Sequence, residues 1–424
     1  QTDDFEKYSK SIATNYPITN QFNDADVKLY EGVKDQFANW KYLSRSDWDK
    51  TYPTPVVMDN LTEKLRYDMQ YTHDIVEDPT KRMPKYGQSG SEKLIDLYGV
   101  DYNDPAWDKL LDQLSWEDMN NLATVGGGIA GAPSVNAPSG NAKDGPAGLN
   151  VGNPTVMCFP SECNMASTFN KLLIEELGNA FGMEIMHVGY QGIYGPGANI
   201  HRSPYSGRNW EYFSEDPYIS SVMLASEVTG LQNRGIIVFT KHFLLNDTER
   251  NRYSVAVFTN EQSIREIYLR SFETACSEAK MNGIMSSFNR IGAIWSGKHK
   301  GLLTKVLRNE WGFLGVVQTD AYVGTHMHMA IAESVIAGND FTMGGAVSNK
   351  FDQWRDSPTL VSALRETCHR LLYTKVNSFS MNGMSTSTII VYHTPWWQTA
   401  LLSGEIVSAV LFGISGLMLI LGFV

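Results

Sequence analysis

The chain has 424 residues, of which 42% are hydrophobic and 19% are charged, and its formal net charge is −11. These values are typical of a globular protein with room for one large domain and additions, or for two ordinary domains. The acidic balance argues against nucleic-acid binding, because phosphate contacts require clustered lysine and arginine. Gly126-Gly127-Gly128 lacks the Lys-Ser/Thr of a phosphate-binding loop and is predicted to be a turn.

Metal-binding patterns are weak in this sequence. The spacing of the four cysteines fits no zinc motif: Cys158, Cys163, Cys276 and Cys368. Cys158 and Cys163 could form a disulfide or remain thiols. His326 and His328 form a His-x-His pair without a nearby cysteine or acidic partner. We therefore expect no metal site.

The first hundred residues differ in composition from the rest of the chain. Residues 1–45 are polar and are predicted to be a connector, and residues 46–100 are predicted to wrap around the outside of the main domain. That domain as a whole is predicted to cover residues 46–379, with its regular elements starting near Leu110. Ser115, followed by acidic residues, is predicted to cap a helix there.

Helix-like and strand-like segments then alternate. Helices are predicted at residues 171–186, 218–233, 260–279, 303–310 and 351–377. Buried strands are predicted at residues 235–240, 283–288 and 315–319. Alternating units of this length favour a parallel sheet, and specifically an α/β fold of the (β/α)8 barrel type.

Polar residues follow several of these strands. Asp320 ends the run Gly315-Val316-Val317-Gln318-Thr319-Asp320, and Lys241 and His242 follow the strand at residues 235–240. Arg208 follows a Gly-Pro-Gly segment farther upstream. In a (β/α)8 barrel such strand ends meet at one face, where active sites are built. A carboxylate among cationic side chains, without a metal motif, indicates sugar chemistry.

Six motifs resemble glycoside hydrolase family 3 and occur in the order found in that family. They lie at residues 144–149 (DGPAGL), 192–218 (GIYGPGANIHRSPYSGRNWEYFSEDPY), 241–243 (KHF), 285–290 (MSSFNR), 302–320 (LLTKVLRNEWGFLGVVQTD) and 337–343 (AGNDFTM). The resemblance covers roughly residues 100–345 and implies a retaining glycosidase without a cofactor.

The resemblance identifies Asp320 as the nucleophile that forms a covalent glycosyl-enzyme. The family has Ser-Asp-Trp at this point, whereas this chain has Thr319-Asp320-Ala321. The missing tryptophan usually borders the sugar, and Tyr322 is expected to replace part of its surface. The alternative without catalysis is that Asp320 caps the following helix.

The resemblance also implies which residues hold the sugar. Asp144 matches the acid that binds the non-reducing end, and Arg208, Lys241 and His242 match groups that grip sugar hydroxyls. Met285 and Phe288 match residues that line the pocket, although the family usually has tyrosine at the second position. On the residues alone, each of these could instead be a turn residue, an ion-pair partner or a core residue.

The general acid/base is missing from the matched motifs. In two-domain family members a second domain supplies it, and residues 1–45 resemble the junction in members where that domain comes first. The resemblance therefore implies an absent N-terminal α/β sandwich domain, or a partner chain, as the source. Asp247 and Glu249 are candidates from the loop after the Lys-His motif.

The end of the chain is strongly apolar. Residues 380–399 are predicted to be a linker, and residues 400–424 are predicted to form a transmembrane helix. Trp396 and Trp397 precede it, where an aromatic belt is expected. A buried core helix is the alternative. We expect a cell-membrane protein with its catalytic domain outside the cell.

Together these features predict an exo-acting β-glucosidase that removes terminal, non-reducing β-D-glucosyl residues from an oligosaccharide or glycoside. The first alternative is a β-xylosidase or α-arabinofuranosidase, since the family includes both. The second is a surface sugar-binding protein with an impaired site, which the missing acid/base, Phe288 and Ala321 favour. The third is a structural subunit of a larger assembly.

Overall fold

The computed structural model describes residues 9–42, 61–70, 74–152, 156–253, 255–322, 329–344, 351–390 and 396–422. His326 and His328 lie outside the described residues. The chain forms two compact units, residues 1–386 and residues 387–424, and each is considered by itself.

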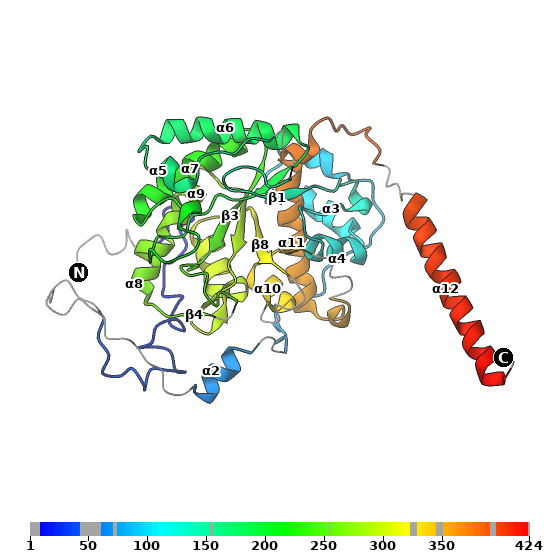
Figure 1. The fold of residues 1–424 in the computed structure, drawn as a ribbon, viewed down its shortest axis with the longest axis horizontal. Helices are drawn as coiled ribbons and strands as arrows, with labels where there is room; N and C mark the ends of the chain where they lie inside the picture. Colours follow the sequence, from blue (N-terminus) through cyan, green and yellow to red (C-terminus); the bar gives the residue numbers. More distant parts are fainter. Residues whose placement is uncertain are drawn as a thin grey trace. The chain divides into compact units, whose positions relative to one another are not determined.

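A six-stranded parallel sheet forms the centre of the first unit (Figure 1), with the strand order β1-β2-β3-β5-β8-β9. The strands are β1 (Ala142–Asp144), β2 (Gly192–Tyr194), β3 (Ile237–Phe243), β5 (Gly283–Ser286), β8 (Val316–Ala321) and β9 (Phe341–Met343). Every neighbouring pair is parallel. The α/β class and the parallel arrangement predicted from the sequence are confirmed.

The sheet is a half-barrel in the described part of the chain, so six strands stand where a closed barrel of eight was predicted. Residues 124–128 run between its two outer strands. Gly127 O accepts a hydrogen bond from Ala142 N at 2.7 Å, and Thr124 O accepts one from Thr342 Oγ1 at 3.1 Å. A Cβ at Gly126 would lie 2.3 Å from the backbone nitrogen of Gly344. Only glycine permits this close approach. The predicted turn therefore lies between the two outer strands of the half-barrel and contacts both, but it is not itself a strand.

Helices cover both faces of the sheet (Figure 1). One face packs against α6 (Lys171–His187), α7 (Pro217–Gln232) and α9 (Arg270–Ser277). The other face packs against α3 (Ala106–Gln113), α4 (Trp116–Thr124) and α11 (Pro358–Val376). The shorter helices are α2 (Glu63–Asp68), α5 (Glu162–Ala166), α8 (Glu261–Ser263) and α10 (Ile331–Ala337). A small second sheet is formed by β4 (Ala256–Val257), β6 (Arg290–Ile291) and β7 (Ile294–Trp295).

Most predicted helices are confirmed, with local differences. The helix predicted at residues 260–279 is divided into α8, a π-helical turn at Ile264–Tyr268, and α9. The segment Gly301–Glu310 is also π-helical. Ser115 caps α4 as expected, since its hydroxyl accepts from the Asp118 backbone. All four cysteines are free.

The N-terminal segment is more than a polar connector. Phe22 and Ala25 are fully buried in the main core. Val33 and Phe37 form a smaller core with Leu65. Because two backbone amides of this segment also donate to the Glu261 carboxylate at 3.0 and 2.9 Å, the segment is fixed to the half-barrel.

The buried carboxylate of Asp340 joins several elements. It accepts hydrogen bonds from Arg308 at 2.8 Å, from Arg370 at 2.7 Å and from the Val317 backbone at 2.7 Å. These partners lie on the π-helical segment, on α11 and on β8. A buried carboxylate with two guanidinium partners is well compensated, whereas removal of the carboxylate leaves Arg308 without its carboxylate and Arg370 with only the more distant Glu366, at 3.9 Å.

The second unit contains the helix α12 (Trp396–Leu421), which has no buried residues. By length and composition it is able to cross a membrane. It begins before the predicted boundary at residue 400, so Trp396 and Trp397 form its first turn.

We predict that Asp340→Ala lowers the free energy of unfolding by about 3–5 kcal/mol, because Arg308 loses its carboxylate partner and Arg370 loses its nearest one. Denaturant unfolding followed by circular dichroism measures this effect. Glu273→Gln, which removes a half-exposed ion pair with Arg270, is the control and should leave stability nearly unchanged. Equal effects of the two substitutions would contradict the prediction.

Candidate active site

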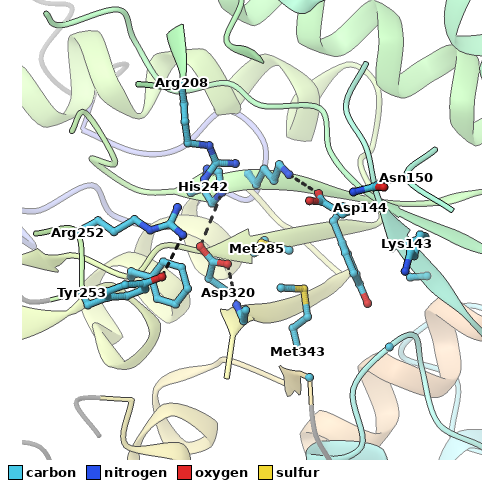
Figure 2. A pocket seen from close by; sticks show the side chains of 17 residues that line it. Lys143, Asp144, Asn150, Arg208, His242, Arg252, Tyr253, Met285, Asp320 and Met343 are labelled. Atoms are coloured by element: carbon cyan, nitrogen blue, oxygen red, sulfur yellow. Dashed lines mark hydrogen bonds and ion pairs between the residues drawn. The ribbon is translucent and has the colours of Figure 1, made fainter. Parts of the chain in front are cut away.

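A pocket of about 680 Å³ lies at the carboxyl ends of the central strands (Figure 2). Strands β1, β2, β3, β5, β8 and β9 all contribute to its wall. Its lining residues are Gly127, Ala142, Lys143, Asp144, Asn150, Tyr194, Arg208, Lys241, His242, Arg252, Tyr253, Met285, Phe288, Asp320, Ala321, Met343 and Gly344. The volume lies within the range of small-molecule sites.

Seven of the eight residues predicted for the site line this one pocket: Asp144, Arg208, Lys241, His242, Met285, Phe288 and Asp320. Tyr322 is the exception. It packs against an apolar cluster beside the pocket, and its backbone nitrogen donates to Met343 O at 2.6 Å. The roles of all eight residues toward a sugar stay predictions.

Asp320 occupies the end of β8 and is almost completely buried. One carboxylate oxygen, Oδ1, accepts a hydrogen bond from Ala321 N at 2.7 Å. The other, Oδ2, has no hydrogen-bond partner among the described residues and lies 3.7 Å from His242 Nε2. The oxygen nearest His242 is therefore the one left available for chemistry.

Burial raises the pKa of Asp320 to about 6, because the charged form loses its hydration. The Ala321 N–H and the positive charges of Arg208, Lys241 and Arg252 act in the opposite direction. Asp320 is thus ionised at neutral pH but remains poorly compensated. Perturbed carboxylates of this kind cluster at functional sites.

Lys241 emerges from β3 and is almost fully buried. Its ammonium group lies 2.7 Å from Asp144 Oδ1 and 3.8 Å from Glu211 Oε1. Asp144 itself is 57% exposed, so the ion pair has one buried and one open member. A buried lysine requires such a partner, and the open carboxylate faces the pocket.

From Lys241 and Glu211, a row of residues with alternating charge continues along the pocket. Arg208 pairs with Glu211, and its other nitrogen lies 3.8 Å from Glu249 Oε1. Glu249 Oε2 accepts a hydrogen bond from Arg252 at 2.7 Å. Figure 2 shows Arg208, Arg252 and His242 on one side of Asp320, and Asp144 on the other. Each guanidinium is thus held in place by a carboxylate behind it.

The side chain of one asparagine, Asn199, binds both the backbone N–H and the backbone C=O of His242. Asn199 Oδ1 accepts from His242 N at 2.8 Å, and Asn199 Nδ2 donates to His242 O at 3.0 Å. Burial lowers the pKa of His242 well below its usual value, and the nearby Arg208, Lys241 and Arg252 lower it further. The imidazole is therefore neutral.

Arg252 and Tyr253 are the main site residues absent from the sequence prediction. The guanidinium of Arg252 lies over the Phe288 ring at 4.9 Å and over the Tyr253 ring at 5.1 Å. Both residues belong to an irregular loop, which gives no periodic signal. The charged residues between positions 246 and 252 are the only sequence feature that points to this loop as part of the site. Lys143, Asn150, Tyr194 and Met343 also line the pocket without having been predicted.

The two candidate acids of that loop do not line the pocket. Glu249 lies behind Arg208 and Arg252. Burial raises the pKa of Asp247 to about 7, opposed by Arg202, but its carboxylate lies away from Asp320's pocket. Within the described residues, no group of three or more His, Cys, Asp or Glu could hold a metal ion.

Comparison with known proteins relates this pocket to one family. The family model of the glycosyl hydrolase family 3 N-terminal domain matches residues 142–363. The chain belongs to glycosyl hydrolase family 3. The matched region runs from β1, which carries Asp144, past Asp320 and into α11.

The chain is similar to a β-glucosidase of Rhizobium radiobacter, with 35% identity over 267 residues, covering 61% of this chain and 31% of that protein. A β-glucosidase of Ruminococcus albus is 35% identical over 246 residues, covering 54% of this chain and 26% of that protein. The chain therefore spans about a third or less of the length of these curated relatives.

Solved structures give the same relationship. β-Glucosidase 3B of Thermotoga neapolitana in complex with glycerol aligns with a TM-score of 0.57 and 33% identity, covering 64% of this chain and 43% of that one. A β-glucosidase of Paenibacillus barengoltzii aligns with a TM-score of 0.65 and 25% identity, covering 82% and 40%.

We predict that Asp320→Asn is more stable than the unmodified chain at pH 8, by about 3 kcal/mol, and that the difference shrinks toward pH 4. The pKa of Asp320 is about 6 in the folded state against 3.8 for an exposed aspartate. Wild-type stability is therefore lost as pH rises through 6, whereas asparagine does not titrate. Denaturant unfolding at both pH values measures the gap, and a gap independent of pH would contradict the assignment.

Proposed function

We propose that this chain is the glycone-binding part of a retaining, exo-acting β-glucosidase. Asp320 attacks the anomeric carbon of a terminal β-D-glucosyl residue and forms a covalent glycosyl-enzyme. The observation that carries the proposal is Asp320 Oδ2, a buried carboxylate oxygen without a hydrogen bond in the described structure, at the wall of a sugar-sized pocket. The family membership and the similarity to two β-glucosidases support the same reaction class.

The surrounding charges suit a neutral polyhydroxylated ligand. Asp144 is the exposed end of its ion pair and can accept two sugar hydroxyls, while Lys241 and Arg208 can donate to others. His242 is neutral and buried beside the nucleophile. In this proposal these groups hold the ring so that its anomeric carbon faces Asp320. Holding the two reacting atoms in place lowers the entropic part of the activation barrier.

The proton donor comes from another domain or a partner chain in this proposal. Among the described residues that line the pocket, the carboxylates are Asp320 and Asp144, and Asp144 is already paired with Lys241. The same observation favours a second candidate function, a sugar-binding protein whose site no longer catalyses. A leaving group that departs without protonation distinguishes the two.

The test uses 2,4-dinitrophenyl 2-deoxy-2-fluoro-β-D-glucoside, which requires a nucleophile but little acid assistance. We expect one sugar to be added to the chain, at the peptide that contains Asp320, and no addition to Asp320→Asn. Methyl β-D-glucoside, whose leaving group needs a proton, should remain uncleaved by the chain alone. Intact mass and peptide mapping measure the label.

The Asp144→Asn variant serves as a matched control, because it keeps the nucleophile but weakens the grip on the sugar. It should be labelled at the same peptide, more slowly. A folded wild-type chain that binds glucose but takes no label would reject the enzyme proposal in favour of the sugar-binding one.

We further propose that α12 anchors the chain in a membrane, with the pocket outside the cell. The support is its length of 26 residues, its apolar composition and its lack of buried side chains, together with the tryptophans of its first turn. Deletion of residues 387–424 should move the protein from the carbonate-resistant membrane pellet to the soluble fraction. Substitution of Leu411 and Leu417 by alanine is the milder control and should leave the protein in the pellet. Retention of the truncated chain in the pellet would contradict the anchor.

A further inference from the structure

The His242 ring is connected to a line of buried polar groups that leads away from the pocket. The line runs from Glu249 through Asn246 and Tyr212 to His242, and Asp320 lies on the far side of the imidazole. The last three members before Asp320 are almost completely buried. The hydrogen-bond directions along such a line determine which ring nitrogen carries the proton.

We propose that Tyr212 is a positioning residue whose hydroxyl fixes His242 as the tautomer with its proton on Nε2, facing Asp320. This inference rests on the proposed function, since it assigns a role to the same site. The role belongs to the free chain and needs no ligand to be present.

The direction of the line is set at its outer end. Glu249 accepts a hydrogen bond from Arg252 at 2.7 Å, and a carboxylate has no hydrogen to donate. The group of Asn246 that faces Glu249 at 3.1 Å must therefore be its NH2 nitrogen. A swap of the amide would place two acceptors against each other, so Glu249 fixes the orientation of Asn246.

The same nitrogen of Asn246 lies 3.0 Å from the Tyr212 hydroxyl. The hydroxyl oxygen thus accepts from Asn246, and its own hydrogen remains for another acceptor. Burial raises the pKa of Tyr212 well above its usual value, which keeps the phenol protonated. His242 Nδ1, at 3.2 Å, is the acceptor that this hydrogen reaches.

An Nδ1 atom that accepts a hydrogen bond carries no proton. The imidazole is neutral, so its single proton is on Nε2. This nitrogen lies 3.7 Å from Asp320 Oδ2 and presents a donor to that oxygen or to a sugar hydroxyl between them. The opposite tautomer would direct a lone pair at the carboxylate, which is unfavourable inside a buried site.

The experiment records long-range proton–nitrogen spectra of the full chain with histidine labelled by nitrogen-15, and the His242 signals are identified by their loss in His242→Gln. We expect an unprotonated, pyridine-type Nδ1 and a protonated, pyrrole-type Nε2. In Tyr212→Phe the two shifts should move toward each other as both tautomers become populated. Labelling by the dinitrophenyl fluoroglucoside should slow about 10-fold, which corresponds to the loss of one hydrogen bond of about 1.4 kcal/mol.

Tyr373→Phe is the matched control, because Tyr373 lies on α11 against Trp107 and does not line the pocket. It should change neither the His242 shifts nor the labelling rate. Glu249→Gln is the second variant in case Tyr212→Phe does not fold. It removes the acceptor that orients Asn246, and a smaller shift in the same direction is expected.

A protonated Nδ1 in the wild-type chain would overturn the inference, and so would His242 signals that do not change in folded Tyr212→Phe. Its failure is separable from that of the proposed function. A wild-type chain with the expected tautomer but no label loses only the enzymatic proposal, whereas a labelled chain with the opposite tautomer loses only the role of Tyr212.

Discussion

The ion pairs of Asp340 are the interaction on which the arrangement of the half-barrel depends. This one carboxylate accepts hydrogen bonds from arginines of two separate helical segments and from the Val317 backbone of β8. It lies at the start of β9 and therefore fixes the relative positions of the last two strands and the helix α11. Asp320 is on β8, so its position depends on this buried contact, none of whose members lines the pocket.

The pocket is also organised by ion pairs, and it contains more of them than the Asp340 cluster does. Cations from the central sheet and its loops are each held by a carboxylate, from Asp144 through Lys241, Glu211 and Arg208 to Glu249 and Arg252. Because paired charges stay in fixed positions, their hydrogen-bond donors are oriented before any ligand arrives. Asp320 differs from Asp144, the open carboxylate of its ion pair, in being almost completely buried, and this burial raises its pKa to about 6.

Much of this could be predicted from sequence where a buried strand ends in a polar residue. Lys241, His242 and Asp320 follow apolar runs, and parallel strands bring their ends together. Arg252 and Tyr253 could not be found this way, because an irregular loop carries them and only tertiary contacts decide its path. Tyr322 was placed by analogy with a missing tryptophan, but its ring packs into an apolar cluster beside the pocket. The described residues form six strands where a barrel of eight was predicted, and Gly126-Gly127-Gly128 lie between the sheet edges as a turn, a conformation that periodicity does not detect.

The strands that build the pocket are far apart in the chain. Asp144 on β1 and Asp320 on β8 line the same cavity, although they lie 176 positions apart in the sequence. Contacts of such long range slow folding, because the entropy of closing the intervening loops is lost before they contribute. The pocket thus comes into existence together with the whole sheet, and no short fragment of the chain can carry it. A measurement of ligand binding to this pocket would therefore also test whether the whole sheet has formed.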